Sequence, residues 1–184
     1  MGMTPIEGLV MGTRCGDVDP ALPFYLLRQM PIAADEIERL LNAETGLKGI
    51  CGANDMREIL ARASSGNDRA TLAIEMFCYR IKKYIGSYIA VLGRVHAIVF
   101  TGGIGENAAP IRERICAGLE HLGIVIDRSM NAAPNGEVAE VQQHGAAVRV
   151  LVIRTDEEWE IAQQSAQAID RAAAAREPRS AQRR

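Results

Sequence analysis

The sequence predicts an α/β fold, and three observations support this prediction. An apolar run, "VHAIVF", leads directly into a glycine-rich stretch, which is typical of a buried strand followed by a turn. From there onwards the chain alternates as strand, helix, strand, loop, strand, helix. Its 184 residues are 48% apolar, which is enough to form a hydrophobic core.

The first part of the chain is predicted to hold loops and short helices. Residues 1–20 are rich in Gly, Thr, Pro and Asp and are expected to form loops and turns. Helices are expected over residues 21–30 and 33–46, and Gly46 is the expected stop of the second helix. The glycines after residue 46 predict a further loop, and Asn54 is the expected cap of a short helix.

The clearest single element is a long amphipathic helix over Asp68–Leu92. Apolar residues recur there at steps of three and four, at Ile74, Phe77, Ile81, Ile85, Tyr88 and Leu92. The opposite face is also apolar, with Leu72 and Met76 among its residues. The helix is therefore either central to the fold or part of a subunit interface.

The second half is expected to contain three strands and two helices. The strands are "VHAIVF", "IVID" and "VRVLVI". The first helix, "APIRERICAGLEHLG", has Pro110 in its first turn and is expected to end at Gly123. The second helix covers residues 155–175, with an inner face of Trp159, Ala162, Ala166 and Ile169.

Composition narrows the class of protein. The net charge of −2 and the pI of 6.0 do not favour a nucleic-acid or acidic-membrane partner. No 18-residue apolar run predicts a membrane span, and the first residues lack the pattern of a signal peptide. The four cysteines form no CxxC pair, so a zinc site is not expected. We expect instead that the cysteines are reduced thiols of a cytoplasmic protein.

Residues 176–184 hold four arginines and are expected to be a disordered basic tail.

The stretch "TGGIGENAAP", residues 101–110, is the first candidate site. Glycines at the carboxyl end of a strand let backbone N–H groups approach a phosphate, and the N-terminus of the next helix favours the anion. The spacing matches neither GxGxxG nor GxxxxGK[ST]. A tight turn that needs positive φ explains the glycines equally well, so both interpretations stay open.

Two further stretches pair an arginine with acidic residues. Arg14 lies on a glycine-flanked loop, where a guanidinium suits a bidentate grip on carboxylate or phosphate. The alternative is an ion pair of Arg14 with Asp17 or Asp19. Asp55 and Arg57 are expected either to hold a ribose or phosphate, or to hold each other.

The acidic run Asp156, Glu157 and Glu158 opens the last predicted helix. Acidic residues at a helix start interact favourably with the helix dipole, which is the simpler explanation. The functional alternative is a magnesium site made of one carboxylate, water molecules and phosphate oxygens.

Taken together and in this order, these stretches resemble the acetate kinase (acetokinase) family. The resemblance rests on "MGMTPIEGLVMGTRCGDVDP", "NDMRE", "FTGGIGEN" and "TDEEW", and it spans nearly the whole chain before the arginine tail. Two positions depart from the family pattern: Arg154 stands where proline is usual, and Asp156 where asparagine is common.

The resemblance implies a fold and a reaction. The fold is a ribonuclease-H-like domain of the acetate and sugar kinase, Hsp70 and actin superfamily, over residues 1–175. The reaction passes a phosphoryl group between ATP and acetate, giving acetyl phosphate and ADP, with Mg²⁺ as cofactor. The partners it implies are the substrates, a second copy in a homodimer, or a separate N-terminal half.

The resemblance also assigns roles to residues of this sequence. Arg14 is the expected catalytic arginine, which binds the transferring phosphoryl group and the acetate carboxylate. Glu157 is the expected magnesium ligand. The expected nucleotide-binding residues are Asp55, Met56, Arg57, Gly103, Ile104, Gly105, Glu106 and Asn107.

The resemblance further implies that the chain corresponds to the C-terminal half of such an enzyme. The family's N-terminal domain and the first strands of its second domain have no counterpart here, so an unpaired sheet edge is expected. Two alternatives to a half-site of acetate kinase stay open: a non-catalytic remnant that binds nucleotide or dimerises, and half of a propionate or butyrate kinase.

Overall fold

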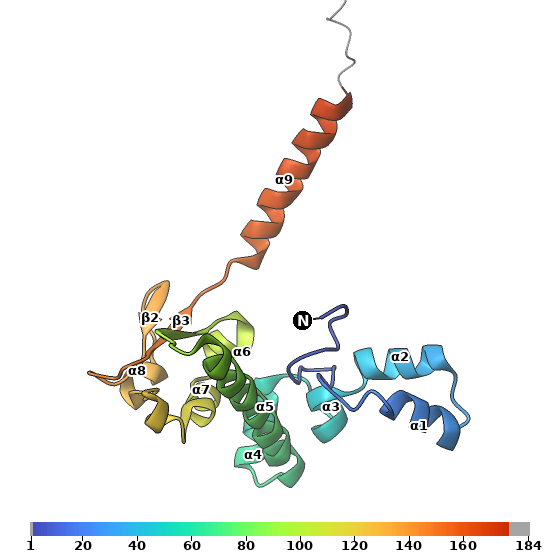
Figure 1. Ribbon diagram of the computed structural model, residues 1–184, viewed down its shortest axis with the longest axis horizontal. Helices are drawn as coiled ribbons and strands as arrows, with labels where there is room; N and C mark the ends of the chain where they lie inside the picture. Colours follow the sequence, from blue (N-terminus) through green and yellow to red (C-terminus); the bar gives the residue numbers. More distant parts are fainter. Residues whose placement is uncertain (1, 177–184) are drawn as a thin grey trace, which may run out of the picture. The chain divides into compact units, whose positions relative to one another are not determined.

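The computed structural model describes residues 2–176. Within this range the chain forms two units: the first ends at Ile153 and the second begins at Arg154. Figure 1 shows the elements coloured along the chain. The predicted α/β class is confirmed, since the first unit combines helices with a small mixed sheet.

In the first unit the helices and strands are, in chain order, α1 (Leu22–Gln29), α2 (Ala34–Ala43), α3 (Gly46–Cys51), α4 (Met56–Ser64), α5 (Asp68–Leu92), β1 (Ala97–Phe100), α6 (Gly102–Asn107), α7 (Ala109–Cys116), the 3-10 turn η1 (Glu120–Leu122), α8 (Arg128–Ala132), β2 (Val138–Glu140) and β3 (Arg149–Ile153).

The sheet has the strand order β1-β3-β2. β1 runs parallel to β3 with Ile98 opposite Val150, whereas β2 runs antiparallel to β3 with Ala139 opposite Val152. β1 is therefore an edge strand, and within the described residues its second edge pairs with no other strand. This agrees with the expected unpaired sheet edge, and Val99 on β1 is 49% exposed.

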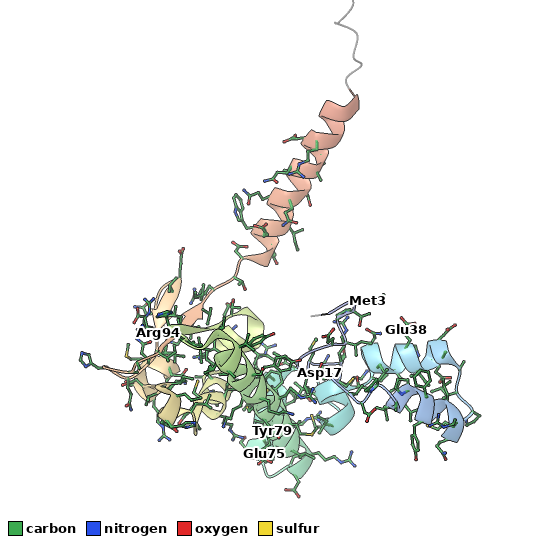
Figure 2. The ribbon with its side chains drawn as sticks, in the orientation of Figure 1. Met3, Asp17, Glu38, Glu75, Tyr79 and Arg94 are labelled. Atoms are coloured by element: carbon green, nitrogen blue, oxygen red, sulfur yellow. The ribbon has the colours of Figure 1, made fainter. Side chains whose placement is uncertain are left out.

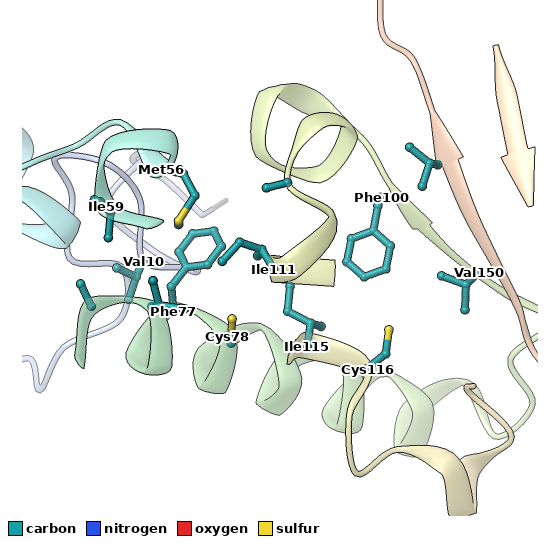
Figure 3. Packing of buried hydrophobic residues seen from close by; sticks show 14 of the residues in the cluster. Val10, Met56, Ile59, Phe77, Cys78, Phe100, Ile111, Ile115, Cys116 and Val150 are labelled. Carbon is teal, nitrogen blue, oxygen red and sulfur yellow. The ribbon is translucent and has the colours of Figure 1, made fainter. Parts of the chain in front are cut away.

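The hydrophobic core joins the sheet to α5 through α7. Figure 3 shows Phe77 and Cys78 of α5 facing Ile111 and Ile115 of α7. Phe100 and Val150 extend the same cluster to the sheet, while Val10, Met56 and Ile59 extend it to the N-terminal loop and α4. Burial of this apolar surface is the main force that holds the first unit together.

The predicted boundaries of the long helix are confirmed, because α5 spans Asp68–Leu92. Asn67 caps it by accepting a hydrogen bond from the backbone N–H of Ala70 at 2.9 Å. Its buried residues are Ala70, Ala73, Ile74, Phe77 and Cys78, all in the N-terminal half. Tyr88 and Leu92 in the C-terminal half are exposed. The first half is thus a core helix, and the second half presents apolar side chains on the surface.

Three expectations for the first part of the chain are wrong. Gly46 does not end the helix before it: α2 ends at Ala43, and Gly46 begins α3. The loop expected after residue 46 is instead this helix, Gly46–Cys51. Gly46 has φ +64, and a Cβ there would lie 2.2 Å from the carbonyl oxygen of Met11, so only glycine fits. The cap of α4 is Asp55, not Asn54, because the Asp55 carboxylate accepts from the N–H of Arg57.

Three expectations for the second half are also wrong. "IVID" forms no strand and contributes only an isolated bridge between Ile126 and Gln142. The helix expected to reach Gly123 ends at Cys116, because Gly118 with φ +82 breaks it. The expected loop before the last strand instead contains α8 and β2. Short elements of three to five residues carry too few apolar positions to show a period.

The second unit contains one helix, α9 (Glu157–Arg176). The expected inner face of this helix is not buried, since Trp159, Ala162, Ala166 and Ile169 are all exposed. The expected basic tail, residues 176–184, lies outside the described residues beyond Arg176, and the domain boundary at residue 175 stays a prediction.

The described residues also bear on membrane and redox chemistry. No helix among residues 2–176 is long and apolar enough to cross a membrane. All four cysteines are free, and burial raises the pKa of the Cys78 thiol to about 11 and that of Cys116 to about 12. These two thiols are therefore protonated core groups rather than nucleophiles.

The two faces of α5 give a direct test of this packing. Ile74 is 0% exposed and Leu72, on the same helix, is 49% exposed. Ile74→Ala is expected to lower the free energy of unfolding by about 2–5 kcal/mol, because it removes buried apolar surface and leaves a cavity. Leu72→Ala is expected to cost less than about 1 kcal/mol. Urea unfolding measures both, and equal losses would contradict the assigned faces.

Candidate functional site

The glycine-rich stretch forms a tight helical turn at the carboxyl end of β1. α6 begins at Gly102, whose φ of +70 favours glycine. The backbone N–H of Gly102 donates to a Glu106 carboxylate oxygen at 2.9 Å, and the Asn107 side-chain amide donates to the carbonyl of Gly103 at 2.9 Å. The glycine-rich stretch is therefore a short helix with internal hydrogen bonds from Glu106 and Asn107.

A cavity of about 700 Å³ lies beside this turn. Residues 7–12 line one side and residues 98–105 line another, so the N-terminal loop and the glycine turn share one cavity. Apolar side chains of α5 complete the lining, among them Phe77, Ile81 and Tyr88. The cavity adjoins the unpaired edge of β1, and most of its surface is apolar.

Asp17 fixes the N-terminal loop against α5. Its carboxylate accepts the backbone N–H of Gly8 at 2.7 Å and the hydroxyl of Tyr84 at 2.5 Å. Arg80 donates to the Asp17 carbonyl at 3.0 Å, and its guanidinium lies 3.6 Å from the carboxylate. The hydrogen bonds from Tyr84 and Gly8 lower the pKa of Asp17. Figure 2 labels Asp17 among the other side chains.

Arg14 lies on a loop that is bound to the start of α3. Its carbonyl accepts the N–H of Met11 at 2.9 Å, and the Met11 carbonyl accepts the N–H of Leu47 at 2.9 Å. The alternative of an ion pair with Asp17 or Asp19 is not found in the described part of the chain. The Nε of Arg14 is buried and has no hydrogen-bond partner there. A buried guanidinium N–H without a partner is costly, and an anionic ligand would satisfy it.

Asp55 and Arg57 hold each other. The Arg57 guanidinium lies 2.6 Å from the Asp55 carboxylate, and the Arg57 backbone N–H donates to the same carboxylate at 2.8 Å. The side-chain hydrogen bond from Arg57 is the main reason why the pKa of Asp55 falls from 3.8 to about 2. Of the two alternatives left open by the sequence, the structure shows Asp55 and Arg57 holding each other. This ion pair does not exclude a bound ligand, because the Arg57 side chain is largely exposed.

The acidic run opens α9 as the simpler explanation predicted. The Asp156 carboxylate accepts the backbone N–H of Trp159 at 2.9 Å, as an N-cap does. The side chain of Glu157 lies outside the described residues. Residues 2–176, where their side chains are described, contain no group of three or more His, Cys, Asp or Glu side chains able to hold a metal ion.

The structure brings some of the predicted site residues together and not others. Residues 103–105 line the cavity with the segment that leads to Arg14, and Gly12 packs against Asn54, next to Asp55. The described lining of the cavity includes neither Arg14 nor Asp55. Glu157 belongs to the second unit, which is described by itself.

Two buried polar residues were not predicted from the sequence. Arg112 and Asn131 are both buried, and Arg112 contacts the backbone of α6. The helical spacing does indicate that Arg112 is buried. Arg112 lies three positions before Ile115 and four before Cys116, which places it on the apolar side of α7.

The comparisons with known proteins decide the family. The model of the acetokinase family matches residues 1–163. The chain belongs to the acetokinase family. It is 58% identical over 175 residues to an acetate kinase of Syntrophobacter fumaroxidans, covering 95% of this chain and 43% of that protein. The family resemblance noted from the sequence is thereby confirmed.

Two solved structures place the fold within this family. The acetate kinase of Porphyromonas gingivalis is similar with a TM-score of 0.83 and 44% identity, covering 92% of this chain and 43% of that chain. A propionate kinase of Francisella tularensis is similar with a TM-score of 0.82 and 44% identity, covering 89% and 41%. The chain thus has the fold of part of these kinases and spans about two fifths of their length.

The Asp55–Arg57 pair predicts a pH effect. Because the pKa of Asp55 is lowered to about 2, its ionised form stabilises the folded state above pH 3.8, and this stabilisation is lost as the pH falls through about 2. Carbon-13 NMR of the Asp55 carboxyl is expected to show its inflection near pH 2. In Arg57→Gln the inflection should move towards 3.8, and an inflection near 3.8 in the unmutated chain would contradict the pair.

Proposed function

We propose that this chain supplies the nucleotide-holding part of an acyl kinase site that transfers a phosphoryl group between ATP and acetate. The 58% identity to an acetate kinase over 175 residues carries the proposal. The glycine turn at the carboxyl end of β1 supports it, because ligands of α/β proteins bind at the carboxyl ends of strands.

The proposed reaction forms one P–O bond and breaks another. A carboxylate oxygen of acetate attacks the γ-phosphorus of ATP, the bond from that phosphorus to the β-phosphate oxygen breaks, and ADP leaves with the electron pair. Catalysis of such a step rests on positioning and on neutralising charge. The Arg14 guanidinium would bind the transferring phosphoryl group and the acetate carboxylate, and its unpartnered Nε supports this role.

The remaining predicted residues are proposed to bind the nucleotide. Residues 103–107 would receive it along the glycine turn, and Asp55, Met56 and Arg57 would contact it from the start of α4. Met56 is 4% exposed, so its side chain belongs to the core and its contribution would come from the backbone.

Mg²⁺ is the proposed cofactor, with Glu157 as its protein ligand. When bound, the ion neutralises phosphate charge. A single carboxylate fits this ion, because Mg²⁺ on nucleotides keeps several waters and takes phosphate oxygens as further ligands. The Asp156 carboxylate already accepts the backbone N–H of Trp159 as the cap of α9.

The rest of the site is proposed to come from a further length of polypeptide. The chain spans 43% of the Syntrophobacter fumaroxidans acetate kinase. Within the described residues, the apolar cavity and the unpaired edge of β1 are a surface that another segment would cover. Either a separate N-terminal half or the partner copy of a homodimer would serve. Residues 1–175 would form the C-terminal nucleotide-binding domain, and the free thiols suit the cytoplasm.

Propionate is the second candidate acceptor. The Francisella tularensis propionate kinase is as similar as the Porphyromonas gingivalis acetate kinase, at 44% identity. The acyl group can therefore be tested by offering acetyl, propionyl and butyryl phosphate in the same assay.

The proposed function is tested by complementation. The 184-residue chain is mixed with the part of the Syntrophobacter fumaroxidans acetate kinase that it does not match, and ATP formation from acetyl phosphate, ADP and Mg²⁺ is measured. Activity is expected from the mixture and from neither piece alone. Arg14→Ala should lower the rate roughly a hundredfold or more, because it removes charge stabilisation at the phosphoryl group.

The matched control is Arg28→Ala on α1, which removes an exposed arginine. This variant should keep the rate of the unmutated mixture. A folded mixture without activity would support the non-catalytic alternative, and equal rates for Arg14→Ala and Arg28→Ala would contradict the role of Arg14.

A further inference from the structure

Arg112 is a charged side chain inside the core. It lies on α7 and is 1% exposed. Its Nη1 donates to the carbonyls of Gly105 at 2.8 Å and Glu106 at 2.9 Å. These are the two residues before Asn107, the last residue of α6. The last four C=O groups of a helix generally need partners from outside the helix. The Arg112 guanidinium is such a partner at the C-terminal end of α6.

The other side of the same guanidinium is bound to α8. Its Nε donates to the side-chain oxygen of Asn131 at 2.7 Å, and its Nη2 donates to the Asn131 carbonyl at 2.6 Å. Asn131 is buried as well and donates its amide to the carbonyl of Ala109 at 2.9 Å. The planar guanidinium of Arg112 thus links α7, on which it lies, to α6 and α8. Its rigid, planar arrangement of N–H groups fixes the directions of these hydrogen bonds.

Stability alone is a weak explanation for this arrangement. Burying a charge is costly unless every donor is satisfied, and apolar side chains of similar volume often stabilise a core as well or better. The four acceptors of Arg112 are three backbone carbonyls and one amide oxygen, with no carboxylate among them. What this network adds over apolar packing is a fixed backbone position for α6.

The turn that Arg112 holds is the turn that borders the cavity. The hydrogen bonds that Glu106 and Asn107 make to Gly102 and Gly103 are local, and they brace α6 without attaching it to the body of the fold. Arg112 attaches α6 to the rest of the fold. Its guanidinium binds Gly105 and Glu106, seven and six residues earlier in the sequence, and it also binds Asn131 of α8.

We propose that Arg112 is a positioning residue of the nucleotide site: its guanidinium holds the carbonyls of Gly105 and Glu106 so that the backbone of α6 keeps the shape that receives the nucleotide. This inference rests on the proposed function of the glycine turn. It assigns Arg112 no contact with the nucleotide itself.

The test compares Arg112→Met and Arg112→Lys with Arg114→Met in the 184-residue chain. Arg114 is an exposed arginine on the same helix and serves as the matched control. Hydrogen exchange of residues 102–107 without nucleotide is expected to become roughly tenfold faster in Arg112→Met, because hydrogen bonds from a charged group to the turn are lost. Exchange in the buried half of α5 should not change.

The second readout is the Kd of ADP. Arg112→Met should weaken ADP binding roughly tenfold or more, Arg112→Lys should restore part of the loss, and Arg114→Met should bind as the unmutated chain does. A merely structural role would lower the melting temperature and leave the Kd of the folded protein unchanged. Unchanged exchange at residues 102–107 and an unchanged Kd would overturn the inference.

If Arg112→Met does not fold, Asn131→Ala replaces it. This variant removes the acceptor of Nε and leaves the bonds from Nη1 to α6, so smaller changes in the same direction are expected. No change in either readout in Asn131→Ala, together with full ADP affinity in Arg112→Lys, would overturn the inference. Failure of the unmutated chain to bind ADP would instead count against the proposed function, and the exchange data would still decide whether Arg112 holds the turn.

Discussion

The buried face of α5 is the constraint on which the rest of the first unit depends. Ile74 and Phe77 enter a core that reaches α4 on one side and α7 on the other. The same helix anchors the N-terminal loop through Tyr84 and Arg80, which both bind Asp17. The N-terminal loop, α5 and the glycine turn all line one cavity.

Long and regular elements could be predicted from the sequence. α5 was predicted with its observed bounds because 25 residues show the helical period many times over. β1 was predicted because an apolar run meets glycines at its end. The location of the glycine turn at the carboxyl end of a strand followed from the same two features.

What the sequence could not predict depends on contacts between distant residues. β2 has three residues and exists only because β3 pairs with it, so no local pattern marks it. The sequence did not show whether Asp55 pairs with Arg57 or waits for a ligand, whereas in the structure the Arg57 guanidinium lies 2.6 Å from the Asp55 carboxylate. The burial of Arg112 was not predicted, because its acceptors are carbonyls of α6 and α8 that only the folded chain brings together.

Two stretches far apart in sequence, residues 55–57 and 102–107, are proposed to receive one nucleotide. The most direct test is NMR of the ¹⁵N-labelled chain during titration with ADP and Mg²⁺. We expect amide shifts in both stretches that saturate at the same ADP concentration, with little change at the exposed helix α1. Shifts confined to one stretch, or spread over α1 and α2 instead, would contradict a single nucleotide site built from both.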